Sequence, residues 1–209
     1  MRNKLLILFG MVIIIIGCTI MLYDATLREY QSRVEEKNVI DFFEKYDVSS
    51  SEKDTNNEYI IEKQDETVIE QIYEEYDDSI AVLEIPKIKL KRTIYDIYSI
   101  KNNVNKNISL LKESVLPGLE TVSHIFLAAH AGNSYISYFK NLYLLSLNDD
   151  IYFYFQNKKY IYKVVDIYEI AKENKSFIKQ TAMQDISLIT CISGTNKRLI
   201  VLAKLEKII

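Results

Sequence analysis

The most constraining stretch of this sequence is residues 185–202, which has the pattern of two strands joined by a tight loop. Residues 186–191 and 199–201 are apolar and rich in β-branched side chains, which favours strands. The turn sequence Ser-Gly-Thr-Asn lies between them. Antiparallel pairing across this turn would place Cys191 directly opposite Arg198, with Cβ atoms ~5 Å apart on one face of the sheet.

A thiol and a guanidinium held this close can act together, because a permanent cation favours the nucleophilic thiolate. The alternative is a buried structural cysteine beside an ordinary surface arginine, and the spacing alone does not choose between them. The chain has only two cysteines, Cys18 and Cys191, and two histidines, which excludes multi-cysteine zinc sites. Its formal net charge of -3, with no basic block, argues against nucleic acid as a partner.

The N-terminus combines Arg2 and Lys4 with an unbroken apolar run over residues 5–22. As a helix this run spans ~27 Å, close to the thickness of a bilayer core. Basic residues before the run predict a cytoplasmic N-terminus and a single-pass protein of the cell membrane, with the remainder extracellular. A cleaved signal peptide is the alternative, but the run is long for one and lacks a small-residue cleavage site. Cys18 falls inside the run, where we expect a packing or lipid-facing role.

Three regions are predicted: a transmembrane signal-anchor at 1–23, an extracellular stalk or linker with helical segments at 24–78, and a folded domain at 79–209. Within the stalk we expect a polar helix at 24–48, a linker at 49–66 and a short helix at 66–76. Leu27, Val34 and Ile40 would form the apolar stripe of the first helix. In the exported part Cys191 has no second cysteine to pair with, which indicates a reactive thiol.

The folded domain has the pattern of an all-β protein. Besides the hairpin, strands are expected at residues 80–85, 88–97, 123–129, 150–155 and 160–170, and short helical segments at 102–112, 137–145 and 176–180. Many short strands without a βαβ rhythm predict a barrel or sandwich with small helical insertions.

Acyl transfer needs a thiolate, a proton carrier and a donor for the oxyanion. Cys191, a histidine and Arg198 supply these groups. His130 ends an apolar strand just before a glycine-containing loop, whereas His124 begins the same strand, and both would share one face if the strand is regular. The position at the strand end favours His130, although either could be a partly buried structural histidine.

Several segments resemble the sortase family. Leu-Ile-Thr-Cys at 188–191, with Arg198 on the next strand, is similar to the family's Thr-Leu-x-Thr-Cys signature and its following arginine. Ile-Pro-Lys-Ile at 85–88 resembles the opening of the barrel, and the residues around Leu-Pro-Gly at 116–118 and Phe-Leu-Ala-Ala-His-Ala-Gly-Asn at 126–133 resemble the strand that carries the catalytic histidine. Segments 139–143 and 149–152 extend the similarity, which covers about residues 80–206.

The resemblance implies a closed β-barrel of about eight strands, and it selects His130 over His124. It implies that Cys191 attacks an LPXTG-like sorting signal, that His130 handles protons and that Arg198 stabilises the oxyanion. The implied partners are secreted proteins with sorting signals and an amine acceptor, either a peptidoglycan precursor or another protein. No cofactor is expected. Ser187 and Ala129 depart mildly from the family's usual Thr and Gly.

Thr190, Asn133 and Ser134 are further candidates for substrate binding, although a strand threonine and turn residues equally suit structural roles. Glu173 and Asp185 are candidate ligands for the calcium ion that some sortases bind, but two separated carboxylates do not make such a site, and we expect no metal.

The short segment between residues 170 and 186 disfavours class B, and the lack of a second apolar span before Ile209 disfavours class C, so a class D-like enzyme is predicted. Two alternatives stay open: a non-catalytic exported barrel that binds the wall, and a cysteine endopeptidase that uses water.

Overall fold

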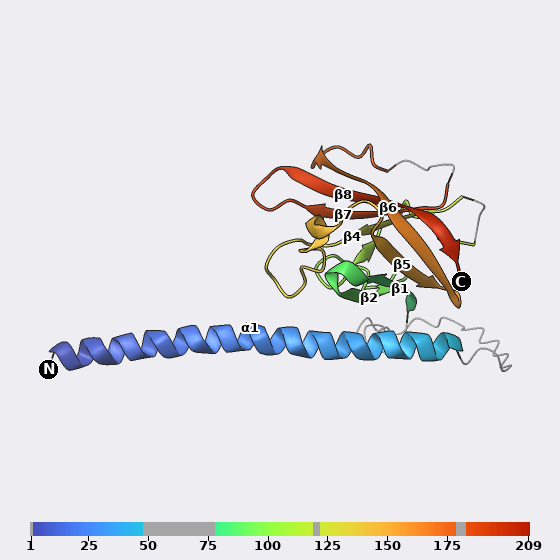
Figure 1. Cartoon of the computed structure of the whole chain (residues 1–209). Coiled ribbons are helices and arrows are strands. Elements are labelled where there is room, and N and C mark those ends of the chain that lie inside the picture. Colours follow the sequence, from blue (N-terminus) through green and yellow to red (C-terminus); the bar gives the residue numbers. More distant parts are fainter. Residues whose placement is uncertain (1, 48–77, 119–121, 179–182) are drawn as a thin grey trace, which may run out of the picture.

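The computed structural model describes residues 2–47, 78–118, 122–178 and 183–209. The expected linker at 49–66 and short helix at 66–76 lie outside these ranges. One long helix, α1 (Arg2–Asp47), runs beside a β-barrel that is built from the C-terminal part of the chain (Figure 1).

Eight strands make up the sheet of the described chain. They are β1 (Ser79–Ile85), β2 (Leu90–Tyr95), β3 (Ser109–Leu110), β4 (His124–Ala128), β5 (Asp150–Phe155), β6 (Lys158–Ala171), β7 (Asp185–Cys191) and β8 (Lys197–Ile208). Their order is β2-β1-β5-β6-β8-β7-β4-β3, and every neighbouring pair is antiparallel except β4 and β7, which are parallel. The end strands β2 and β3 approach each other, which leaves a nearly closed barrel and confirms the predicted fold class.

The barrel interior is filled by alternate apolar side chains of the strands. In β5, for example, Ile151, Phe153 and Phe155 are buried, while the residues between them are half-exposed. Strand β7 is buried on both faces. Leu188 belongs to the interior core, and Ile189 joins a second cluster with Phe126 on the other face. The central strands of the site are therefore held from both sides.

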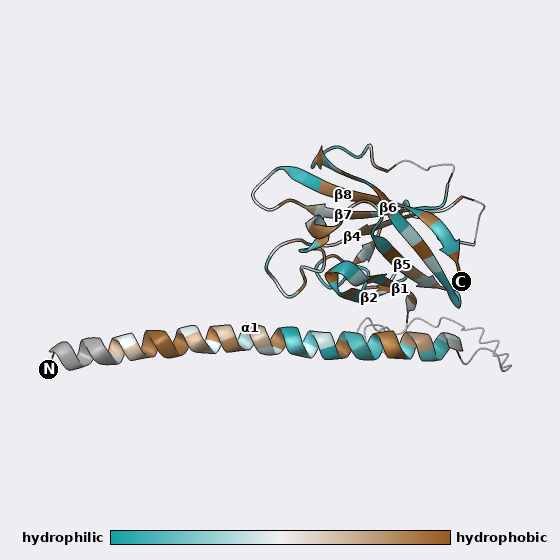
Figure 2. Ribbon diagram, viewed as in Figure 1, coloured by the Kyte–Doolittle hydropathy of each residue, from teal (hydrophilic) through white to brown (hydrophobic). Residues whose placement is uncertain are grey.

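Helix α1 is continuous across residue 23, where the boundary between anchor and stalk was expected. It is mostly apolar from residue 9 to residue 23 and mixed beyond, as the colours of Figure 2 show. It is long and apolar enough to cross a membrane, and its apolar window is not buried against any described residue. The predicted stripe is wrong in part, because Ile40 is exposed and the buried positions are Glu35, Val39 and Phe42, which are spaced as one helix face.

The helix expected at 102–112 is also wrong. This segment forms turns followed by β3. The Asn102 side chain accepts from the Leu110 N–H at 2.7 Å and donates to the Leu110 carbonyl at 3.0 Å. Asparagine side chains compete for the backbone in this way, which favours turns over helix.

The segment 137–145 is mostly turns, with only a short 3-10 helix, η3 (Leu142–Leu144). A second 3-10 turn, η2 (Pro86–Ile88), links β1 to β2, so β2 begins later than expected. Residues 176–177 form a turn, and 179–180 of the expected helical segment lie outside the described residues.

Candidate active site

Cys191 is the last residue of β7, and Arg198 is the second residue of β8. The two are directly paired in the antiparallel ladder, which confirms the predicted register. The loop between them is closed by a hydrogen bond from the Ile192 N–H to the Lys197 carbonyl at 3.0 Å. Gly194 has a φ of 74°, a left-handed conformation that suits glycine. Cys191 is exposed and Arg198 is half-buried, so the sulfur is open to a substrate.

His130 is the second residue after the end of β4. Because β4 and β7 are parallel, their carboxyl ends meet at one edge of the sheet. The Ala129 N–H donates to the Ile189 carbonyl at 3.2 Å, which continues the ladder up to His130. The His130 carbonyl then accepts from the Phe139 N–H at 3.0 Å. The backbones of His130 and Cys191 thus leave the sheet side by side, 61 residues apart in sequence.

Thr190 connects these two strands. Its hydroxyl donates to the carbonyl of Ala129 at 2.8 Å, and its side chain is buried. The peptide just before His130 is therefore fixed to the residue just before Cys191. This contact favours the structural interpretation of Thr190, although the residue also lines the cleft beside Cys191.

The His130 imidazole has a partner that no sequence motif indicated. Its Nε2 lies 3.0 Å from Oδ1 of Asn105, in the turn segment between β2 and β3. An amide oxygen only accepts hydrogen bonds, so Nε2 is the protonated nitrogen in this arrangement. The one sequence signal for Asn105 is the asparagine-rich run around it. The apolar residues of the same segment are spaced as in a helix, which led to the helix prediction in place of turns.

A cleft of about 500 Å³ opens beside Cys191. Its walls are formed by Ala131, Asn133, Phe139, Lys140, Asn141, Tyr143, Thr190, Cys191, Ile192, Ser193 and Leu199. His130 and Arg198 are not part of this wall, but each is adjacent to a wall residue in sequence. Asn133 lines the cleft, whereas the Ser134 carbonyl accepts from the Ser137 N–H in a turn.

His124 lies away from this cleft. Its side chain is only 2% exposed and stacks on Phe126 with ring centroids 4.0 Å apart. Its Nε2 is 2.8 Å from the hydroxyl of Ser187. It is a satisfied core histidine, and because β4 ends before His130, the two histidines do not share one regular strand.

The family model described as "Sortase domain" matches residues 83–206, more than half of the chain. The chain belongs to the sortase family. As a sortase, it is a cysteine transpeptidase with the barrel fold of that family.

Solved sortases have the same fold. Sortase A from Corynebacterium diphtheriae (a lid mutant) is 26% identical with a TM-score of 0.56, over 62% of this chain and 70% of that one. Streptococcus agalactiae sortase C1, in a complex with MTSET, gives the same values. Sortase C-1 from Actinomyces oris is 23% identical with a TM-score of 0.57, over 70% of this chain and 83% of that one. No curated protein sequence matches the chain.

The loop at the site of this sortase is also held by side chains of β6 and of the turn that follows it. The Asn196 side chain donates to Glu173 at 2.9 Å, and this hydrogen bond lowers the pKa of the Glu173 carboxyl. Lys197 pairs with Glu169 at 2.8 Å. Asp185, by contrast, is fully buried in β7. Within the described ranges no three acidic, histidine or cysteine side chains cluster as a metal site would require.

Proposed function

We propose that this sortase cleaves a C-terminal LPXTG-like sorting signal on secreted proteins and transfers the protein to an amine. The observation that carries the proposal is the pairing of Cys191 with Arg198 beside the strand end that presents His130. Together these residues supply a nucleophile, an oxyanion donor and a proton carrier at one edge of the barrel.

In the first half-reaction the Cys191 thiolate attacks the carbonyl carbon of the Thr–Gly-type bond. Negative charge develops on the carbonyl oxygen, and the Arg198 guanidinium donates to it. His130, as imidazolium, gives its proton to the departing nitrogen, so the C–N bond breaks and a free amine leaves. The product is a thioester between the substrate carbonyl and Cys191.

In the second half-reaction an amine attacks the thioester carbonyl. His130, now neutral, takes the proton of the attacking nitrogen, an amide bond forms and the thiolate is released. The amine comes from a peptidoglycan precursor or another protein, which are the partners proposed for this chain. Neither half-reaction calls for a cofactor or metal.

The position of Asn105 supports the role of His130. The hydrogen bond from Nε2 to Oδ1 of Asn105 holds the imidazole from the loop that follows β2. A histidine that is fixed at one nitrogen keeps a defined orientation for proton transfer at the other.

For the location of the enzyme, we propose a single-pass protein of a Gram-positive cell membrane. The apolar half of α1 would span the bilayer, and Arg2 and Lys4 before it would keep the N-terminus in the cytoplasm. The barrel would lie outside the membrane, on the side of the cell wall. The class D-like assignment stays a prediction, since the similar structures named above are class A and class C enzymes.

The test is product analysis by mass spectrometry with a panel of sorting peptides, each with and without an added amine. We expect the amine-linked product with the wild type and none with Cys191→Ala, which should keep the circular dichroism spectrum of the wild type. Cys18→Ala is the matched control and should keep full activity. Turnover by Cys191→Ala would refute the mechanism, and exclusive hydrolysis at saturating amine would favour a water-using endopeptidase.

A further inference from the structure

Helix α1 joins the predicted anchor and the predicted stalk in one element. Residues 11–23 are exposed and almost entirely apolar, and the same helix continues without a break to Asp47. Because all residues of a continuous helix share one axis, the direction of its first half also determines the direction of its second half. If its first half spans a bilayer, as proposed above, its second half determines the orientation of the barrel relative to the membrane.

The second half of α1 is docked firmly on the barrel. Val39 and Phe42 pack with Val82 of β1, and the Phe43 ring meets Tyr154 of β5 edge to face at a centroid distance of 5.0 Å. These contacts hold the C-terminal end of α1 against the sheet.

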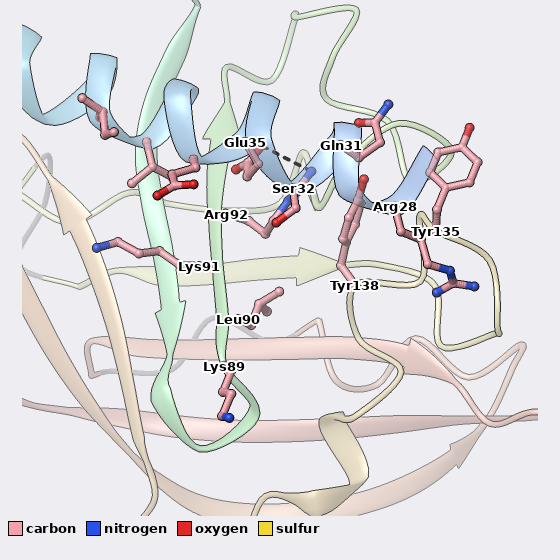
Figure 3. A pocket seen from close by; sticks show the side chains of 13 residues that line it. Arg28, Gln31, Ser32, Glu35, Lys89, Leu90, Lys91, Arg92, Tyr135 and Tyr138 are labelled. Atoms are coloured by element: carbon pink, nitrogen blue, oxygen red, sulfur yellow. Dashed lines mark ion pairs between the residues drawn. The ribbon is translucent and has the colours of Figure 1, made fainter. Parts of the chain in front are cut away.

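A buried polar contact adds to this docking. Glu35 of α1 accepts from the Thr93 N–H at 2.5 Å and pairs with Arg92 at 3.3 Å. Figure 3 shows this pair facing each other between the helix and β2, with the Tyr138 ring beside Arg92. A buried ion pair with specific hydrogen bonds fixes one register of the helix on the strand. The barrel is therefore not free to swing about the helix.

The end of the barrel that carries the candidate active site points along α1 toward its N-terminus. In Figure 1 the loop between β7 and β8 and the loop after β4 both extend on that side, while the C-terminus lies at the other end. A direct contact agrees, since Arg28 donates to the carbonyl of Asn133 at 2.6 Å. Asn133 also lines the cleft that contains Cys191, so the helix reaches the wall of the site.

Arg28 is close to the end of the apolar run. It comes six residues after Leu22, so its rise along the helix axis beyond that residue is ~9 Å. The headgroup region adds roughly 5–7.5 Å on each side of the hydrocarbon core, so Arg28 would lie just outside the headgroups. The loop that follows His130 would therefore lie at the surface of the bilayer.

The residues that this end exposes suit such a surface. Tyr143 lines the cleft and is 68% exposed, and Leu144 beside it is 45% exposed. Tyr135, in the loop that Arg28 contacts, is 40% exposed. Tyrosine is enriched where membrane meets water, and the exposed Lys140 in the same cleft wall would favour anionic lipids.

We propose that the end of the barrel that carries Cys191 lies on the outer surface of the lipid bilayer. The continuous helix α1 holds it in this orientation. The cleft beside Cys191 then opens toward substrates that are themselves held at the membrane surface, and solution substrates reach it only from the side. This inference rests on the proposed membrane anchor.

The test is depth-dependent fluorescence quenching of the full chain in vesicles of phosphatidylcholine and phosphatidylglycerol. Each variant carries one labelled cysteine in a Cys18→Ala, Cys191→Ala background. Tyr143→Cys reports the end with the candidate active site. Lys158→Cys is the matched control at the β5–β6 turn, beyond Tyr154, whose contact Phe43 lies ~22 Å further along α1 than Arg28.

With a quencher in the lipid headgroups, we expect at least a threefold stronger quenching at Tyr143→Cys than at Lys158→Cys. A flexible Gly-Ser insert between Ala25 and Thr26 should remove the difference. In detergent, where no bilayer lies against the cleft, the same insert in the unmutated enzyme should leave cleavage of a soluble peptide unchanged, since it replaces no residue of the site.

The outcomes separate the two proposals. Equal or reversed quenching in a chain that resists alkaline extraction would overturn the membrane-facing orientation and leave the anchor intact. A chain that is extracted from the vesicles would overturn both. Loss of peptide cleavage by Cys191→Ala is measured independently, so the proposed reaction stands or falls without reference to the orientation.

Discussion

Cys191 and Arg198 occupy opposite positions in the last hydrogen-bonded rungs of the β7–β8 hairpin, and both side chains rise from the same face of the sheet. The pair is held by a short closed loop, so neither residue depends on a distant segment for its place. The β7–β8 hairpin alone therefore determines the relative positions of the proposed nucleophile and its cation.

The first prediction concerns Arg198. Arg198→Ala should lower kcat/KM by about 10²–10³-fold, the usual effect of removing one oxyanion donor. Arg198→Lys should recover only part of the loss, because an ammonium group lacks the planar fork of donors. The control is the neighbouring Lys197→Ala, which removes a surface pair with Glu169 and should change kcat/KM less than twofold. Steady-state kinetics with a fluorogenic sorting peptide would measure all three, and full activity in Arg198→Ala would contradict the assigned role.

The second prediction concerns Asn105 as a positioning residue for His130. Asn105→Ala frees the imidazole Nε2 and should lower kcat about tenfold, near the ~1.4 kcal/mol of one hydrogen bond. KM should change little, because Asn105 holds the imidazole and does not line the cleft. Asn174→Ala in the loop after β6 is the control, since its side chain only supports a local turn. A lower free energy of unfolding with kcat unchanged would show that Asn105 acts on the fold alone.

The third prediction concerns Thr190. Thr190→Val leaves the buried carbonyl of Ala129 without its donor and should lower the free energy of unfolding by about 1–3 kcal/mol. It should also lower kcat, because the peptide before His130 is no longer fixed. Thr190→Ser retains the hydroxyl and should stay near the wild type in both respects. Urea unfolding and peptide kinetics give the two readouts, and equal behaviour of the Val and Ser variants would exclude this contact as the cause.

The fourth prediction concerns pH and the docking of α1. Burial raises the pKa of the Glu35 carboxyl above its ordinary 4.5, and this outweighs the opposing effects of Arg92 and the Thr93 N–H. The folded chain then binds this proton more readily than the unfolded chain. The stabilising contribution is full below pH 4.5 and is lost as pH rises through the raised pKa.

Urea unfolding of the full chain in detergent, measured between pH 4 and 8, would test this sign. Glu35→Gln cannot titrate, so the stability difference between wild type and variant should move against the wild type as pH rises. A difference that moves the other way would mean that the ion pair with Arg92 dominates over burial.

Local patterns predict much of the barrel. The alternating residues of β5 and the apolar run of β4 fall where strands are found, and the turn chemistry before Lys197 sets the Cys191–Arg198 register correctly. The errors fall where side chains compete with the backbone. The apolar spacing within 102–112 favours a helix. In the structure, however, the Asn102 side chain bonds the N–H and the carbonyl of Leu110, as a neighbouring strand would.

The remaining features depend on contacts between distant segments. Glu35 is a charged residue on a polar helix, and only the approach of Arg92 and the Thr93 N–H accounts for its burial. The role of Asn105 likewise depends on its hydrogen bond with His130, 25 residues later. Neither contact can be predicted from the periodicity of a local stretch of sequence.

The sequence by itself determined the apolar N-terminal segment, the strands and the hairpin that pairs Cys191 with Arg198, because hydrophobic periodicity and turn residues act over a few neighbours. The tertiary structure decided that the end of β4, where His130 lies, is beside Cys191, through the parallel pairing of β4 with β7. It also decided where the cleft faces, because α1 docks on the barrel through residues that are far apart in the chain. Such pairings depend on the burial of complementary surfaces in three dimensions, which a one-dimensional pattern does not specify.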